Sequence, residues 1–232
     1  MSVARVLDDL DVDIAKVDRD LEGAPAGGIV AWAVGAFGDG LVLTTSMTDA
    51  VLVDVATRVE PGIEVVFVDT GYHFPETLAT LAEVTRRYDL NLNVVSAGLS
   101  SDGRWRPDPD GCCAVRKVAP LEELLVERQA WMTGLRRADG RGRAEVRAVD
   151  IDHRGLVKVN PLAAWTDADV DAYIAEHDIP VNPLVAAGYP SIGCWPCTRP
   201  VPDGADPRAG RWAGRDKTEC GLHLPRLRRR AG

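Results

Sequence analysis

Short apolar runs alternate with amphipathic stretches along the first two-thirds of the chain. The runs are rich in Val, Leu and Thr and have the length of buried strands. The stretches between them place apolar side chains at helical spacing, and Pro75 suits the first turn of one such helix. The predicted strands are 41–45, 64–68, 92–96 and one that begins at 130–133, and the predicted helices are 49–59, 75–88, 121–127 and 168–177.

Segments rich in Gly, Pro, Asp and Ser separate these elements. Residues 96–111 and 139–143 are predicted to be loops, and Thr166 is predicted to cap the helix that follows it. From Pro180 onward Pro and Gly become frequent, so regular structure should become sparse there.

Alternation of strands and helices predicts an α/β fold, in which a parallel twisted sheet carries helices on both faces. Open sheets of this kind bind ligands beyond the carboxyl ends of their strands. The loops 44–49 and 69–74 each follow a predicted strand, so they are candidates for a ligand site.

Composition narrows the choice of partners and compartment. The 232 residues carry a formal net charge of −8, which argues against non-specific binding to nucleic acid. No segment reaches the roughly 18 to 20 consecutive apolar residues of a membrane span, and residues 1–20 resemble no signal or transit peptide. We therefore expect a cytoplasmic protein with reduced thiols and no membrane partner.

Five cysteines, an odd number, give the strongest local signal. Cys112 and Cys113 are adjacent, and Cys194 and Cys197 form a C-x-x-C pair, so four thiolates in two close pairs predict a metal site. Zinc usually takes its ligands from spaced pairs, but the pattern alone leaves an iron–sulfur cluster, zinc and unrelated buried thiols open.

Cys220 lies apart from the two pairs. The nearby His223 and Lys217 could favour its thiolate, which is the nucleophilic form, whereas Glu219 would oppose ionisation. Local chemistry therefore leaves both a reactive and an incidental cysteine open.

Polar loops supply further candidates. Residues 44–49 offer hydroxyls and backbone N–H groups at a helix start, an arrangement that suits an anion or plain N-capping by Ser46 or Thr48. Lys117 follows Cys113 by one helical turn and could face both metal and substrate, or solvent. The candidates in the two strand-end loops are Thr45, Ser46, Thr48, Asp49, Asp69, Thr70 and Gly71.

Seven segments together resemble the assimilatory APS/PAPS reductase family, and specifically its iron–sulfur adenylylsulfate (APS) reductase branch. The paired cysteines and the terminal ECGLH are close to diagnostic, because relatives that use 3′-phosphoadenylylsulfate (PAPS) typically keep ECGLH and lack the four cysteines. The matching segments are TTSMTDAVLVD (44–54), FVDTGYHFPETL (67–78), CCAVRKVAPL (112–121), WMTGLRR (131–137), KVNPLAAWTDADVDAYI (158–174), NPLVAAGYPSIGCWPCT (182–198) and GRWAGRDKTECGLH (210–223).

The resemblance implies an adenine nucleotide alpha hydrolase-like fold. A nucleotide- and cluster-binding domain spans 1–198, and a mobile C-terminal tail over 199–232 carries the catalytic cysteine. It assigns Cys220 as the nucleophile, aided by Lys117 and His223, and places the nucleotide at the 44–49 loop. The four other cysteines become ligands of one 4Fe–4S cluster, and the basic residues near the phosphosulfate are Lys117, Arg143, Arg208, Arg211 and His223.

The implied reaction is the reduction of APS to sulfite and AMP during sulfate assimilation. Cys220 attacks the sulfur of APS to give an S-sulfocysteine, and thioredoxin or a similar dithiol protein then releases sulfite. The sequence leaves open whether the chain forms a homo-oligomer. Two departures from the family stand out: the segment before Cys112 is short, and residues 137–143 read RADGRGR, so either Arg141 or Arg143 could contact substrate.

Other functions fit less of the sequence. A cluster-containing reductase could prefer PAPS. An ATP pyrophosphatase or adenylyltransferase would need a Gly-rich SGGxDS loop, and residues 46–50 lack both glycines. A non-catalytic iron–sulfur or zinc module would leave Cys220 and the nearby arginines unexplained.

Overall fold

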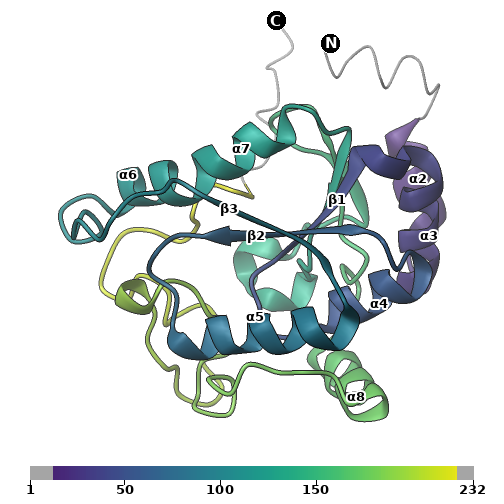
Figure 1. The fold of residues 1–232 in the computed structure, drawn as a ribbon. Coiled ribbons are helices and arrows are strands. Elements are labelled where there is room, and N and C mark those ends of the chain that lie inside the picture. The colour runs from purple at the N-terminus through teal and green to yellow at the C-terminus, as the bar shows by residue number, and fades with distance from the viewer. Residues whose placement is uncertain (1–12, 224–232) are drawn as a thin grey trace, which may run out of the picture.

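A six-stranded sheet forms the centre of the molecule. The computed structural model describes residues 13–223 of the chain. The strand order is β3-β2-β1-β4-β6-β5, and every neighbouring pair is parallel except β5 and β6. This arrangement confirms the predicted parallel sheet, with one antiparallel strand at its edge. Figure 1 shows β1, β2 and β3 in the middle of the molecule, with α7 above them and α5 below them in this view. The strands are β1 (Leu41–Thr45), β2 (Glu64–Asp69), β3 (Asn91–Ser96), β4 (Ala130–Met132), β5 (Val149–Ile151) and β6 (Val157–Val159).

Alternate side chains of each central strand enter two separate apolar cores. Leu41 and Leu43 of β1 join the core beneath α2, α3, α4, α5 and α8, whereas Val42 joins the core beneath α7. Helices therefore cover both faces, as predicted. They are α2 (Ile14–Leu21), α3 (Ala26–Phe37), α4 (Val51–Val59), α5 (Pro75–Tyr88), α6 (Pro109–Cys113), α7 (Ala119–Leu125) and α8 (Asp167–His177).

Most predicted elements lie within a few residues of their observed bounds. The helix over 75–88 is confirmed at both ends, and Thr166 caps α8 by accepting a hydrogen bond from the Asp169 N–H. Helices α2 and α3 and strands β5 and β6 were not predicted from the sequence. Helix α3 reads AGGIVAWAVGAF and is apolar on most sides, so it lacks the periodic pattern of an amphipathic helix.

The predicted loop over residues 96–111 is wrong at its C-terminal end. Residues 96–111 were expected to be irregular, but α6 begins at Pro109, where the Asp108 side chain accepts the Gly111 N–H at 2.8 Å. A π-helical turn over Ala114–Val118 then joins α6 to α7. The segment over 139–143 contains short 3₁₀ turns, Arg137–Asp139 and Arg141–Arg143, in place of a plain loop.

The chain after Thr198 packs on the face that carries α7. The Trp212 N–H donates to the Cys197 carbonyl at 2.8 Å, and Trp212 and Leu222 belong to the core on that face. Residues 224–232 of the predicted tail lie outside the described part, and mobility of residues 199–223 stays a prediction. Over residues 13–223, the structure contains no helix with the length and apolar character needed to cross a membrane.

Candidate active site

The strand order creates a crevice at the carboxyl ends of β1 and β4. The chain runs outward from β1 to β2 and β3, then returns to the other side of β1 with β4, so the loops after β1 and β4 diverge. A cavity of about 410 Å³ opens there. Its walls come from the loop after β1, the segment after β4 and the C-terminal segment.

Most of the predicted site residues meet in this cavity although they come from distant parts of the sequence. Asp69 and Gly71 are not among the residues that line it. Instead, the Asp69 carboxylate accepts the Gly71 N–H at 2.8 Å and closes the turn after β2. The predicted residues in the cavity wall are Thr45, Ser46, Thr48, Asp49, Thr70, Lys117, Arg143, Cys194, Arg208, Arg211, Cys220 and His223.

The loop after β1 is shaped without the expected cap. Neither Ser46 nor Thr48 caps α4, whose N-cap position is Ala50, and the Asp49 carboxylate instead accepts the Val51 N–H at 3.0 Å. Burial raises the pKa of Asp49. The Asn182 side-chain amide donates to the Met47 carbonyl at 3.1 Å and so fixes the backbone of this loop.

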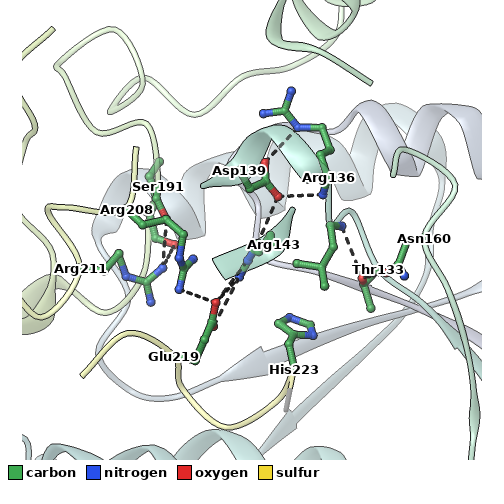
Figure 2. Close-up of polar contacts among 12 residues, drawn as sticks. Thr133, Arg136, Asp139, Arg143, Asn160, Ser191, Arg208, Arg211, Glu219 and His223 are labelled. Carbon is green, nitrogen blue, oxygen red and sulfur yellow. Dashed lines mark hydrogen bonds and ion pairs between the residues drawn. The ribbon is translucent and has the colours of Figure 1, made fainter. Parts of the chain in front are cut away.

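An arginine cluster surrounds Glu219 at one side of the cavity (Figure 2). Arg143 and Arg208 both donate to the Glu219 carboxylate, and Arg143 also pairs with Asp139 at 3.2 Å. Burial, reinforced by the nearby Arg143, lowers the pKa of Arg208 to about 10. Arg211 donates to the Ser191 hydroxyl and to the Ile192 carbonyl, each at 3.3 Å. Two guanidinium groups of the cluster thus share one carboxylate of the protein itself.

Cys220 lies beside this cluster with 8% of its surface exposed. Burial alone would raise the pKa of its thiol, but Lys117, the Leu222 N–H and Arg211 outweigh burial and leave the pKa below its ordinary value. The thiolate is the nucleophilic form, so these contacts favour a reactive cysteine.

The four paired cysteines converge on a second, smaller pocket that adjoins the cavity. Cys112 and Cys113 reach it from α6, and Cys194 and Cys197 reach it from the turn Trp195–Cys197 and the residue before it. Aromatic side chains complete an apolar wall. Five residues line both the pocket and the cavity: Thr70, Lys117, Cys194, Arg211 and Cys220.

The chemistry of this pocket fits a polynuclear thiolate centre. Burial raises the pKa of Cys112, Cys197 and Cys113, the last to about 12, and neighbouring cysteines add to each rise. Thiolates crowded in an apolar pocket repel one another, and a bound metal centre relieves that repulsion. Among residues 13–223, no three Cys, His, Asp or Glu side chains are grouped closely enough to share one metal ion. A 4Fe–4S cluster takes one thiolate on each iron, so the donor set fits that group.

Sequence reasoning missed several residues of the cavity wall. The segment after β4 supplies Thr133, Arg136 and Asp139, and the C-terminal segment supplies Glu219. The signal for the first three was their position directly after a strand that borders the switch point of the sheet. Glu219 carried no comparable signal, because its role depends on arginines far away in sequence.

Comparison with known proteins identifies the family and agrees with the fold. Residues 40–200 match the phosphoadenosine phosphosulfate reductase domain family. Adenosine 5′-phosphosulfate reductase of Streptomyces coelicolor is 47% identical over 228 residues, which cover 94% of this chain and 97% of the relative. The protein of the same name from Mycobacterium bovis (strain BCG / Pasteur 1173P2) is 46% identical, with coverage of 90% and 92%.

Solved structures show the same architecture. The phosphoadenylyl-sulfate (PAPS) reductase of Candida auris, in a phosphate complex, superposes with a TM-score of 0.71 at 28% identity, covering 80% of this chain and 96% of that one. Candida glabrata FMN adenylyltransferase in complex with ATP shares the fold alone, at 13% identity and a TM-score of 0.57, covering 97% of this chain and 84% of that one. With a family match over residues 40–200 and near-full-length relatives at 46–47% identity, this chain belongs to the phosphoadenosine phosphosulfate reductase family.

Proposed function

We propose that this protein is an adenylylsulfate reductase, an oxidoreductase that converts APS to sulfite and AMP in sulfate assimilation. The observation that carries the proposal is the position of Cys220, a buried thiol with a lowered pKa between an anion-binding cavity and four paired cysteines. Relatives with 46–47% identity bear the name of this activity. The cavity of about 410 Å³ has the size of a small-ligand site.

The first step is attack of the Cys220 thiolate on the sulfur of APS. A bond forms between Sγ and the sulfonyl sulfur while the S–O bond to the phosphate breaks, and AMP leaves with that electron pair. Negative charge develops on the sulfonyl and phosphate oxygens, where Arg143, Arg208 and Arg211 can donate charge-assisted hydrogen bonds. The Lys117 ammonium helps to lower the pKa of the Cys220 thiol and so favours its thiolate form. Glu219 must release Arg143 and Arg208 for the substrate to reach them.

The second step is reductive release of sulfite. A thiolate of thioredoxin or a similar dithiol protein attacks Sγ of S-sulfo-Cys220, and sulfite leaves with the electron pair of the S–S bond. The second thiol of the donor then clears the mixed disulfide, so one dithiol is oxidised to a disulfide. Because Cys220 is 8% exposed in the closed arrangement, the segment over 199–232 acts as a tail that opens from the 1–198 domain for this step. The reaction belongs in the cytoplasm, where dithiol donors stay reduced.

Cys112, Cys113, Cys194 and Cys197 would hold a 4Fe–4S cluster. When bound, the cluster would supply a fixed local charge and link α6 to the turn at Trp195–Cys197. Lys117 lines both the cysteine pocket and the cavity, so its ammonium group can act on both sides. The test is iron, sulfide and zinc analysis of anaerobically purified protein. About four irons and four sulfides per chain are expected, and zinc without sulfide would contradict the assignment.

Replacement of Cys220 with Ser tests the reaction. We expect Cys220→Ser to retain wild-type iron and sulfide content and to lose sulfite release and the S-sulfo adduct, which mass spectrometry detects in the wild type incubated with APS. Cys113→Ser is the matched control, since it should lose iron while leaving Cys220 in place. Sulfite release by Cys220→Ser at the wild-type rate would show that Cys220 is not the nucleophile.

Preference for PAPS is the second candidate, because the Candida auris neighbour is named a PAPS reductase. Steady-state kinetics with both nucleotides decides between the two. A kcat/KM for APS at least about tenfold above that for PAPS is expected. The reverse ratio would establish that the protein prefers PAPS as its substrate.

A further inference from the structure

Lys158 and His223 form a contact that the reaction scheme above does not use. Lys158 is the central residue of β6, and its Nζ lies 3.2 Å from Nδ1 of His223 in the C-terminal segment. The His223 ring stacks on Trp131 of β4 with centroids 5.6 Å apart and planes inclined by 4°. The Lys158 Nζ also lies 5.2 Å from the centre of the Trp131 ring. Two strands, β4 and β6, thus fix the histidine ring and one of its nitrogens.

The charges around this contact decide which group carries the proton. Burial lowers the pKa of Lys158 to about 8, with Arg143 and Arg154 lowering it and Asp152 and Asp150 opposing them. Burial lowers the pKa of His223 well below its ordinary value, and Lys158, Arg143, Lys117 and Arg208 all lower it further. At neutral pH the lysine is therefore the ammonium and the histidine the neutral base of the pair.

A hydrogen bond at 3.2 Å then has one direction. The Lys158 ammonium donates to Nδ1 of His223, and a neutral imidazole that accepts at Nδ1 carries its proton on Nε2. We propose that Lys158 is a positioning residue that holds His223 as the neutral Nε2–H tautomer at the wall of the reaction cavity. His223 there serves as a neutral hydrogen-bond donor to the oxyanion of the substrate, and this role rests on the proposed function.

The assignment changes what His223 can do. The resemblance groups it with the cations near the phosphosulfate, but a neutral Nε2–H donor adds a directed hydrogen bond without adding charge. In this tautomer His223 cannot act as the base that deprotonates Cys220. Its Nε2 already carries a proton, and its Nδ1 already accepts the hydrogen bond from Lys158. The cations that favour the Cys220 thiolate are Lys117 and, to a smaller extent, Arg211.

The tautomer can be read directly by ¹⁵N NMR of full-length protein labelled at histidine. The chain has four histidines, and comparison with the His223→Ala variant identifies the signals that belong to His223. We expect His223 to show the Nε2–H pattern at pH 7 and to stay neutral at pH about 6.5, where a free imidazole is half protonated. An Nδ1–H or an imidazolium pattern at pH 7 would overturn the proposal, whether or not the protein reduces APS.

Variants test the consequence for the reaction. Lys158→Met should raise the pKa of His223, mix its two tautomers and lower kcat about tenfold with KM changed less than about twofold. Lys158→Arg keeps a charged donor and should restore the Nε2–H pattern and most of kcat. In a His223→Ala background, Lys158→Met should cause no further loss of kcat. A full additional loss in that background would show that Lys158 acts independently of His223 and would overturn the proposal. If the NMR result holds but the wild type releases no sulfite from APS, the proposed function fails and the tautomer assignment stands.

Discussion

Arg143 and Glu219 lie 76 residues apart in sequence and meet at the cavity, where Nε and Nη2 of Arg143 each lie 3.2 Å from Glu219 Oε1. Arg208 reaches the same oxygen at 3.1 Å. Two guanidinium groups that could bind a substrate anion are thus engaged by the carboxylate of the residue directly before Cys220. A substrate anion that binds these two arginines would therefore have to displace Glu219.

Replacing that carboxylate should therefore strengthen substrate binding. We expect Glu219→Gln to lower KM for APS about threefold, because the amide competes less well for the arginines. Steady-state kinetics at fixed ionic strength measures the effect. The control is the same change in an Arg143→Met background, where the gain should shrink. An increase in KM would show instead that Glu219 helps to place the tail.

Removing the Lys117 charge should make Cys220 harder to ionise. Lys117→Met is expected to raise the pKa of the Cys220 thiol, because the nearby ammonium helps to hold that pKa down. The pH dependence of Cys220 alkylation by iodoacetamide, followed by peptide mass spectrometry, should therefore move to higher pH. Lys117→Arg keeps the charge and should move the curve much less. An unchanged curve for Lys117→Met would rule out this electrostatic role.

Gly193→Ala should displace Arg211 without changing any charge. A Cβ at position 193 would overlap the Arg211 guanidinium, and the backbone there does not have a positive φ that would itself strain alanine. We expect KM for APS to rise about fivefold while the protein remains folded. Gly28→Ala in α3 is the matched control, since its Cβ would meet nothing within 4 Å. Equal KM values for the two variants would show that Arg211 does not contribute to substrate binding.

A buried carboxylate in α4, on the face of the sheet opposite to α7, should set part of the protein's stability in acid. Asp54 is 4% exposed and accepts hydrogen bonds from Arg58, Tyr88 and Tyr173 at 2.6, 3.1 and 2.6 Å. Burial alone would raise the pKa of Asp54, but the hydrogen bonds from Arg58 and Tyr173 outweigh it and lower the pKa. Asp54→Asn should cost about 1–3 kcal/mol of unfolding free energy at pH 7.

The pH dependence of this cost has a definite sign. A lowered folded pKa contributes stability above the unfolded pKa of about 3.9, and that contribution is lost as the pH falls through the folded value. Urea unfolding at pH 7 and below pH 4 should therefore show the Asp54→Asn deficit shrinking in acid. A deficit that is the same at both pH values would mean that packing, not ionisation, sets it.

Local patterns in the sequence were sufficient for much of the sheet and its helices. Strand β1 was predicted at 41–45 and α5 at 75–88, and both have those bounds. The cap at Thr166 was predicted from residues within one helical turn, as were the two cysteine pairs. These features depend on hydrophobic periodicity, capping and short spacing, which neighbouring residues fix on their own.

The tertiary structure decided what distant segments do together. Strand order is a property of the packed sheet, and it places the loops after β1 and β4 around one cavity. Glu219 pairs with Arg143, 76 positions away, and His223 pairs with Lys158, 65 positions away. No local pattern in the sequence could predict contacts over such separations. The sequence by itself determined which residues could be reactive, because chemistry belongs to the side chain. Packing determined their charges and tautomers, because burial and neighbouring ions shift each proton equilibrium only once the chain has folded.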